Sequence, residues 1–266
     1  MTEPRPLREA DLSRVEAVFT DVDGTLTTGG RLRSSTLGAL ERLDRAGVPV
    51  VLVTGRPAGF AEAWARTLPV AGVIAENGGV SVRLDGRGSL RKTYARPAAV
   101  RARERRRLAR VVRAALRAVP GSRMSTDSRY AEVDLAIDVN EEVRLGPDAA
   151  RRLETFFARR GVNAVRSSVH VNAWIGPFDK AWMVRRFLRT VWKKRLGPGD
   201  RRYVYVGDSL NDAPLFAAFA LSVGVANVRA VEALLEHRPR FVTRAPEGAG
   251  FEEVARAVLR AREGGR

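Results

Sequence analysis

Four short segments of the 266-residue sequence carry side chains that could together transfer a phosphoryl group. Asp21 and Asp23 stand two residues apart at the end of an apolar run, and Thr54, Lys180 and the segment 207–212 follow far downstream. No single segment defines a function, because a lone Asp-x-Asp-Gly is usually a turn or a calcium-type loop. Found together and in this order, they indicate a metal-assisted phosphoryl-transfer site.

Each of these pieces except Lys180 directly follows a short apolar run of the kind that forms a buried strand. The runs are residues 18–20 before Asp21, 51–53 before Thr54 and 204–206 before Gly207. In open α/β sheets, ligands bind at the carboxyl ends of the strands. Strand formation would therefore bring together residues that lie far apart in the sequence.

The acidic side chains of this set predict a magnesium ion. If Asp21, Asp23, Asp208 and Asp212 were crowded together, they would repel one another and raise one another's pKa values. A hard cation relieves this repulsion, and Mg²⁺ with oxygen ligands and a substrate phosphate is the natural choice.

The side chains of these segments suit different chemical roles. Asp21 could attack phosphorus and form an aspartyl phosphate, while Asp23 could protonate the leaving alkoxide and then activate water. Thr54 and Lys180 could hold phosphoryl oxygens, where negative charge must be stabilised in a loose transition state. Gly24 lets the chain turn tightly beside these groups.

Apolar runs that alternate with helical patterns predict an α/β fold with a doubly wound, Rossmann-like parallel-sheet core. Strands are expected at residues 17–20, 48–53, 73–75, 203–206 and 221–223, with a last one near the end. Helices are expected between them, including one that Ser34 or Ser35 could cap, one that Asp179 could cap and one near residues 228–235. Runs that are apolar throughout, such as 48–53, are typical of parallel sheets covered on both faces.

Between the two core stretches the pattern changes to strict alternation. Residues 80–84, 128–139 and 168–174 alternate between apolar and polar side chains, which predicts strands with one buried and one open face. Helices at about 97–119 and 147–159 could cover the apolar side. We therefore predict an inserted α+β cap domain. Its expected bounds are residues 83–175, between core segments 1–82 and 176–266.

The four segments resemble the motifs of the haloacid dehalogenase superfamily. Asp-x-Asp-Gly-Thr, Thr54, Lys180 and Gly-Asp-x-x-Asn-Asp are similar to its four motifs and stand in the same order, over essentially the whole core. An insertion between the second and third motifs, preceded by Glu76-Asn77-Gly78-Gly79, is similar to the type II, Cof-like and sucrose-phosphatase-like branch.

This resemblance implies roles for the acidic residues. A nucleophile is expected at Asp21 and a general acid/base at Asp23. Mg²⁺ would be held by Asp21, the Asp23 carbonyl and Asp208, with Asp212 in support.

Substrate contacts are expected from the core loops and from one cap strand: Thr54, Gly55, Asn77, His170, Asn172 and Trp174. The last three share the polar face of residues 168–174 by period-two geometry. Trp174 could stack on a sugar ring and Asn172 could bond its hydroxyls. His170 fits a solvated sheet residue equally well, and Arg56 is better explained as part of a structural ion pair.

Composition limits the partners. The net charge is +17, but only four of the 47 basic residues are lysines, and one-sided arginine usage favours codon bias over a nucleic-acid surface. The basic run at residues 101–113 carries a helical apolar stripe, so its arginines are expected to form a solvated face.

There is no cysteine, no secretory segment and no apolar stretch of the ~20 residues that a membrane span needs. A cytoplasmic protein without nucleic-acid or membrane partners is expected.

The leading hypothesis is an Mg²⁺-dependent phosphatase that hydrolyses a small phosphorylated metabolite, with a sugar phosphate favoured by the branch it resembles. A phosphomutase of the phosphomannomutase type is the alternative, although its arginine-rich substrate signature is not found. A non-catalytic binding protein is a third reading, disfavoured because a binder does not need both Asp21 and Asp23. The oligomeric state stays open.

Overall fold

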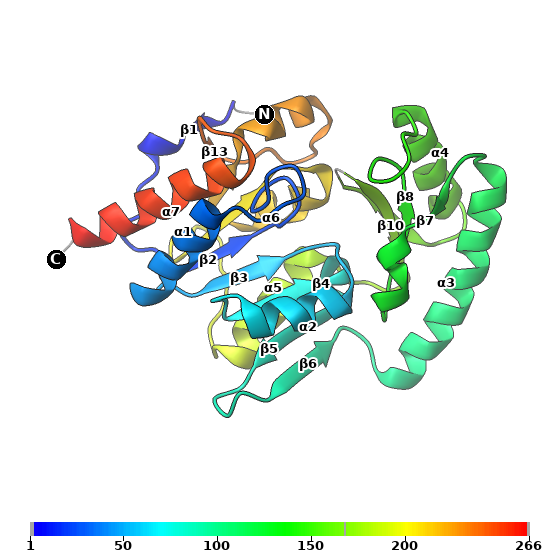
Figure 1. Ribbon diagram of the computed structural model, residues 1–266, viewed down its shortest axis with the longest axis horizontal. Helices are drawn as coiled ribbons and strands as arrows, with labels where there is room; N and C mark the ends of the chain where they lie inside the picture. Colours follow the sequence, from blue (N-terminus) through cyan, green and yellow to red (C-terminus); the bar gives the residue numbers. More distant parts are fainter. Residues whose placement is uncertain (1–2, 168, 265–266) are drawn as a thin grey trace.

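The core is built on one nine-stranded sheet (Figure 1). Its strands lie in the order β1 (Arg5–Pro6), β13 (Phe241–Val242), β12 (Leu221–Gly224), β11 (Tyr203–Gly207), β2 (Ala17–Thr20), β3 (Val50–Val53), β4 (Gly72–Ala75), β5 (Val80–Leu84) and β6 (Leu90–Tyr94). This computed structural model describes residues 3–167 and 169–264. Neighbouring strands from β1 to β4 are parallel, and β5 and β6 are added antiparallel.

Helices cover both faces of this sheet, because its central strands carry apolar side chains on both sides. Three helices pack on one face: α1 (Ser34–Arg45), α2 (Ala58–Thr67) and α7 (Glu247–Glu263). Two others, α5 (Lys180–Val191) and α6 (Ala213–Ala218), pack on the opposite face, where Phe187 and Phe216 join the cluster around Phe19. The predicted doubly wound α/β core is confirmed.

The chain leaves this sheet later than the predicted cap boundary at residue 83. Residues of β6 pair with β5 along its whole length, from Leu84↔Leu90 to Val80↔Tyr94. The sequence did not signal β6, because its strand Leu-Arg-Lys-Thr-Tyr is an edge strand with mostly polar side chains. We therefore shift the proposed start of the cap to the residues after Tyr94, with α3 as its first element.

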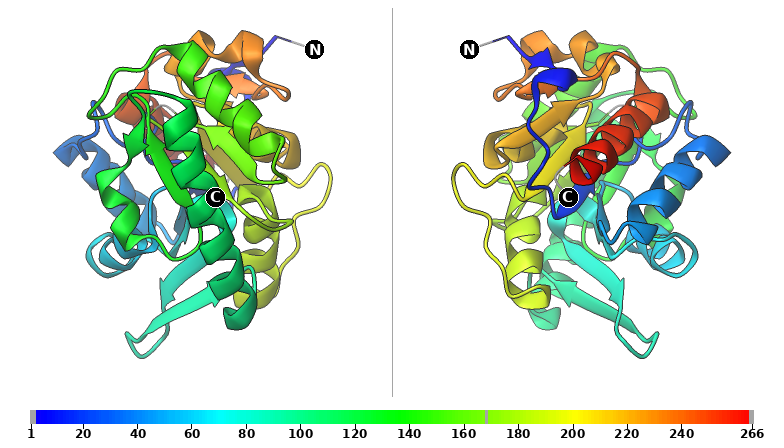
Figure 2. Two further views of the ribbon diagram at one scale, coloured as in Figure 1. Left: turned by 90° about the vertical axis from the view of Figure 1, so that its right-hand side faces the viewer. Right: turned by 90° about the vertical axis from the view of Figure 1, so that its left-hand side faces the viewer.

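A second, four-stranded antiparallel sheet forms the cap. Its order is β7 (Arg123–Met124), β8 (Leu135–Asp138), β10 (His170–Trp174) and β9 (Asn163–Arg166). The predicted helices α3 (Ala98–Ala118) and α4 (Pro147–Ala158) cover one face, where Leu108 and Phe157 pack with Ile137 and Val171. Figure 2 (left) shows this layer in front of the core. The polar face is not open as predicted: His170, Asn172 and Trp174 are all buried.

The predicted strand at residues 128–139 is wrong in its first half, and Glu76 explains why. The Glu76 carboxylate is buried and accepts hydrogen bonds from the backbone N–H groups of Glu132, Val133 and Asp134, at 2.5–3.1 Å, and from that of Ala58 at 2.8 Å. These donors are therefore lost to a strand ladder. The preceding residues Thr126–Tyr130 form a short 3₁₀ helix. Val133 turns away from the cap core to pack with Trp174 and Phe178.

Glu76 therefore anchors the loop before β8 to the core, and its removal should lower the stability of the fold. Glu76→Ala leaves buried N–H groups without an acceptor, and we expect the free energy of unfolding to fall by at least about 3 kcal/mol in urea titrations. Glu253 is a matched control, because it also accepts from two backbone N–H groups, those of Arg244 and Ala245, but near the surface. Glu253→Ala should cost less than about 1 kcal/mol, and equal losses would contradict the anchoring role.

Two further local predictions need correction. Ser34 is the first helical residue of α1 rather than its cap, and no side chain caps that helix. The segment predicted as a helix at 228–235 forms two 3₁₀ turns, Ala226–Ala230 and Glu232–Leu234. Within residues 3–167 and 169–264, no helix has the length and apolarity to cross a membrane.

Candidate active site

The three predicted strand ends meet at one edge of the core sheet. β2 lies between β11 and β3, and the register pairs Thr20 with Val206 and with Leu52. Asp21 follows β2 directly, and its backbone N–H still donates to Val206 at 2.8 Å. Thr54 follows β3, and its N–H donates to Ile74 at 2.8 Å. Side chains that are far apart in the sequence are thereby brought together.

Lys180 reaches the same point from the first turn of α5. The helix starts there because Asp179 caps it, accepting from the Trp182 N–H at 2.6 Å. The Lys180 ammonium is buried and donates to Asp21 Oδ1 at 2.8 Å and to Asp212 Oδ1 at 2.7 Å. One cation thus bridges the predicted nucleophile and the last acid of the fourth motif.

Asp212 is held by donors on both of its oxygens. Oδ1 also accepts from the Tyr205 hydroxyl at 2.5 Å, and Oδ2 accepts from the backbone N–H groups of Asp208 and Ser209 at 3.0 and 3.1 Å. Gly207 must lack a side chain here, because a Cβ would lie 2.5 Å from Asp212 Oδ2. Asp212 therefore orients Lys180 and the Asp208 loop.

Asp208 is positioned by Thr25, the last residue of the first motif, and by Asn227, which the sequence reasoning did not single out. Its Oδ1 accepts from the Thr25 hydroxyl at 3.1 Å, and its Oδ2 accepts from the Asn227 amide at 2.8 Å. Asn227 also donates to the Gly24 carbonyl at 3.0 Å. The signal for Asn227 was its place shortly after β12, at the same edge of the sheet.

The crowding of carboxylates perturbs their proton affinities. Burial raises the pKa of Asp21 to about 7 despite the opposing charge of Lys180, and the nearby charge of Asp212 adds to the rise. Burial and the charges of Asp21 and Asp212 raise the pKa of Asp208 well above its usual range. Burial alone would lower the pKa of Lys180, but the two carboxylates outweigh it and the pKa is raised.

This acidic cluster fits a divalent cation. Asp21, Asp208 and Asp212 each offer an oxygen within 4.8 Å of the others, a group found by searching residues 3–167 and 169–264. Lys180 supplies one positive charge against three carboxylates, and a hard cation with oxygen ligands would balance the rest. Asp212 accepts from Lys180, Tyr205 and two backbone N–H groups, whereas Asp208 accepts from two donors and Asp21 from Lys180, so Asp21 and Asp208 have more free lone pairs for direct ligation.

Asp23 points to a different partner, Arg56. Arg56 Nε donates to Asp23 Oδ2 and Nη2 to Asp23 Oδ1, both at 2.9 Å. The same guanidinium donates to Asp127 at 3.0 Å and to Glu141 at 2.8 Å, both in the cap. The ion pair expected for Arg56 is present. Its cap partners were missed, because nothing in the sequence shows which cap loops reach the core.

The predicted substrate residues fall into two groups. Asn172 donates to the Gly55 carbonyl and to Asp134 at 3.2 Å each, and Asn77 donates to Asp134 at 3.1 Å. Asn172 and His170 line the space beside Asp21. Asn77 and Trp174 line a neighbouring hollow of about 280 Å³ to which Lys180 also contributes. The Trp174 indole N–H donates to the Phe178 carbonyl at 2.9 Å, and its ring packs beside Phe178. Their roles in substrate binding stay predictions.

The space between cap and core beside Asp21 is nearly closed. Its lining comes from both sides: Asp21, Asp23, Thr54, Gly55, Arg56, Ser167, Val169, His170, Asn172, Ser209 and Asn211. The free volume is about 10 Å³, which is roughly the space that one water molecule needs. A phosphorylated metabolite does not fit this space as it stands.

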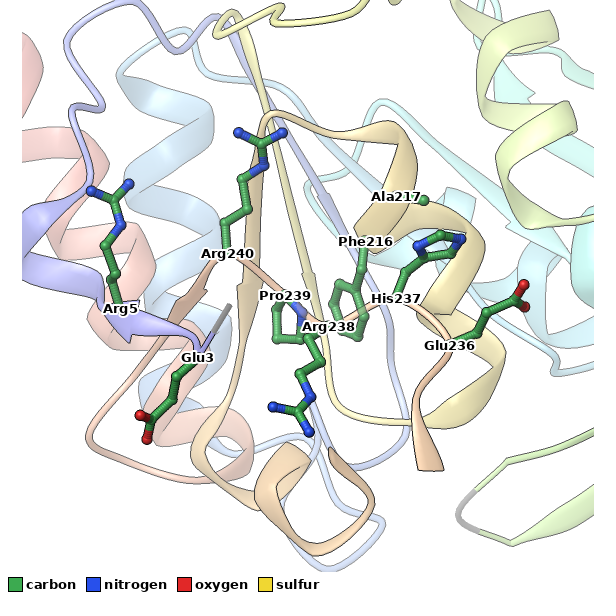
Figure 3. A pocket seen from close by; sticks show the side chains of 9 residues that line it. All are labelled: Glu3, Arg5, Phe216, Ala217, Glu236, His237, Arg238, Pro239 and Arg240. Carbon is green, nitrogen blue, oxygen red and sulfur yellow. The ribbon is translucent and has the colours of Figure 1, made fainter. Parts of the chain in front are cut away.

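A larger hollow lies elsewhere, near β1 and the segment that leads into β13 (Figure 3). It measures about 650 Å³ and is lined by Glu3, Arg5, Phe216, Ala217, Glu236, His237, Arg238, Pro239 and Arg240. In this view Arg5 and Arg240 extend in one direction and Arg238 in the opposite one, and none of the four predicted motifs contributes to the hollow. The residues predicted to be catalytic therefore lie at the small closed space and not at the larger hollow.

Comparison with known proteins gives the family. Residues 18–101 match the family model of the haloacid dehalogenase-like hydrolases. The chain is 30% identical over 242 residues to a phosphoglycolate phosphatase of Archaeoglobus fulgidus, covering 90% of this chain and 95% of that protein. A phosphoglycolate phosphatase of Pyrobaculum neutrophilum is 32% identical over 248 residues, covering 92% and 96%. The chain belongs to the haloacid dehalogenase-like hydrolases.

Solved structures of lower identity share the fold of this haloacid dehalogenase-like protein. A Thermoplasma acidophilum protein superimposes with a TM-score of 0.69 at 19% identity, over 92% of this chain and 98% of that one. The sucrose-phosphatase of Synechocystis gives a TM-score of 0.62 at 15% identity, over 92% and 98%. The expected resemblance to capped haloacid dehalogenase phosphatases is confirmed, and the chain is a phosphatase of this family.

Proposed function

We propose that this phosphatase hydrolyses small phosphomonoesters with Mg²⁺ through an aspartyl phosphate on Asp21. The observation that carries the proposal is the position of the Asp21 carboxylate, buried at the end of β2 with Oδ1 2.8 Å from the Lys180 ammonium. A carboxylate held rigidly at a strand end can attack phosphorus in line, while fixed positive charge stabilises the phosphoryl oxygens.

The reaction has two halves, transfer of the phosphoryl group to Asp21 and its hydrolysis, and residues of the chain act in each. Asp21 forms the bond to phosphorus as the bond to the leaving oxygen breaks, and Asp23 gives that oxygen a proton. In the second half, Asp23 takes a proton from the attacking water, and Asp21 leaves as a carboxylate. Thr54 and Lys180 face the phosphoryl group, while Asp212 keeps Lys180 in place. Closure of the cap excludes bulk water from the acyl phosphate.

Asp21, Asp208 and the Asp23 carbonyl would hold the Mg²⁺ ion, with Asp212 in support. The ion supplies positive charge for the phosphoryl oxygens and for the crowded carboxylates. The main support from this chain is the surplus of buried carboxylates over Lys180.

The metal role gives a direct prediction. Turnover should need Mg²⁺ and should be inhibited by Ca²⁺, because the larger ion takes more ligands at longer distances and would misplace the attacking oxygen. Phosphate release measured in excess EDTA should fall to the background of a protein-free control and recover on addition of Mg²⁺. Full turnover in EDTA would remove the metal from the proposal.

The substrate class rests on the relatives. The phosphatases from Archaeoglobus fulgidus and Pyrobaculum neutrophilum are named for phosphoglycolate, which makes this compound the first candidate. A sugar phosphate, favoured by the sequence, is the second. A phosphate-release screen with Mg²⁺ over both classes tests the proposal, and phosphate release from no member would contradict it.

The cysteine-free composition supports a cytoplasmic location.

A further inference from the structure

Arg56 links core and cap through ion pairs beside Asp23, the proposed acid/base residue. Its guanidinium contacts three carboxylates, those of Asp23 in the core and of Asp127 and Glu141 in the cap. The contact to Asp23 is a two-bond fork, in which Nε and Nη2 each donate to one carboxylate oxygen at 2.9 Å. A lysine cannot form this fork, because its ammonium is a single point charge.

The cap side of the cluster is tied into the cap sheet. Asp127 belongs to the 3₁₀ turn before β8, and it also accepts from the Ser125 hydroxyl at 2.5 Å. Glu141 follows β8, and its Oε2 lies 2.8 Å from His170 Nε2 on β10. Both carboxylates therefore move with the cap, whereas Arg56 and Asp23 move with the core.

Entry of a phosphomonoester between cap and core would break this cluster. The free volume beside Asp21 is about 10 Å³, which is too small for the phosphoryl group of a substrate. When the cap withdraws, Arg56 loses Asp127 and Glu141 and keeps only Asp23 among its three carboxylates. When the cap closes, two carboxylates again fix the guanidinium from the far side, which restricts the orientation of Asp23.

We propose that Arg56 is a positioning residue that couples closure of the cap to the orientation of Asp23. This inference rests on the proposed function, because it assigns Asp23 the proton that the leaving oxygen receives. During the first half-reaction the protonated Asp23 oxygen leaves the fork and delivers its proton to the leaving oxygen, while the other oxygen stays on the guanidinium. Asp23 regains a proton from the attacking water in the second half-reaction. Asp127 and Glu141 act through Arg56 and touch no reacting atom.

The test uses the leaving group as its readout. kcat/KM reports the steps up to transfer of the phosphoryl group to Asp21, and general acid catalysis contributes about 10²–10⁴-fold where the leaving oxygen is basic. An alkyl phosphate needs that proton, whereas p-nitrophenyl phosphate needs it little. Arg56→Ala should lower kcat/KM for the alkyl ester by about 10²-fold more than for the aryl ester. Asp23→Asn should show the same selective loss.

Two milder variants keep the test decisive if Arg56→Ala does not fold. Arg56→Lys retains the charge without the fork and should show the same selective loss, smaller in size. Glu141→Gln removes one cap carboxylate from Arg56 and should shift the alkyl-to-aryl ratio in the same direction. Glu142→Gln is the matched control in the same loop, because Glu142 contacts Arg123 and Thr126 and not Arg56, and it should leave the ratio unchanged.

Equal losses for both esters in the Arg56 variants would show a general structural role and overturn the coupling. An unchanged ratio in Arg56→Lys and Glu141→Gln would overturn it as well. The proposed function is judged separately: activity of Asp21→Asn, or no phosphate release by the wild type, would contradict it whatever Arg56 does. Loss of activity in Asp21→Asn with an unchanged ratio in the Arg56 variants would leave the function in place and reject only the coupling.

Discussion

Asp21→Asn should lower phosphate release by at least about a thousandfold while leaving the fold intact. The amide cannot attack phosphorus, and no other carboxylate takes its place. Asp212 is held by four donors, and Asp208 is held by Thr25 and Asn227. The measurement is kcat for the preferred phosphomonoester in saturating Mg²⁺, together with the thermal midpoint of unfolding.

A matched variant separates loss of the nucleophile from loss of local structure. Asp44 lies in α1, away from the strand ends, so Asp44→Asn makes the same chemical change without touching the site. It should keep the activity of the wild type. Activity of Asp21→Asn clearly above that of an empty-vector preparation would remove Asp21 from the nucleophile role.

Lys180→Met should destabilise the protein by about 3–5 kcal/mol and abolish turnover. The ammonium is buried between Asp21 and Asp212, so its removal leaves two carboxylates facing one another without a protein cation. Urea unfolding measures the loss. Because Mg²⁺ can replace part of the missing charge, we expect the ion to stabilise this variant more than it stabilises the wild type.

Lys194→Met is the control for this variant. Lys194 pairs with Glu16 at the surface, where both side chains are 43% exposed. Pairs of this kind are worth about 0–1 kcal/mol. A loss for Lys180→Met that is no larger than that for Lys194→Met would show that the buried lysine does not hold the acidic cluster together.

The proximity of the motif residues could be predicted from the sequence, because ligand-binding residues of an α/β sheet lie at the carboxyl ends of its strands. Asp21, Thr54 and Asp208 each follow an apolar run, and parallel strands end at the same edge of a sheet. The helix that begins at Lys180 could be predicted because Asp179 is a good helix cap, and the structure shows that hydrogen bond. The place of Lys180 beside Asp21 was expected from the family resemblance and not from a local pattern. Local patterns thus determined the core of the candidate site.

The cap was harder to predict because its details depend on contacts across the interface. The alternation through Val133 predicts a strand. The Glu76 carboxylate of the core instead accepts hydrogen bonds from the backbone N–H groups of residues 132–134. Arg56 lies next to Thr54-Gly55 in sequence, yet its partners Asp127 and Glu141 are fixed only when the cap docks. Competition between local pattern and tertiary contacts decided these positions, and it leaves no periodic signal in the sequence.

The central claim, an aspartyl phosphate on Asp21, can be tested by trapping it in Asp23→Asn. Without the base, hydrolysis of the acyl phosphate is slow, while p-nitrophenyl phosphate can still phosphorylate Asp21 because its leaving group needs little protonation. Rapid mixing with Mg²⁺ should give a burst of about one p-nitrophenol per enzyme. Acid quenching and borohydride reduction should then convert Asp21, and no other aspartate, into homoserine by peptide mass. Steady release of phosphate without a burst, or reduction at a different carboxylate, would contradict the mechanism.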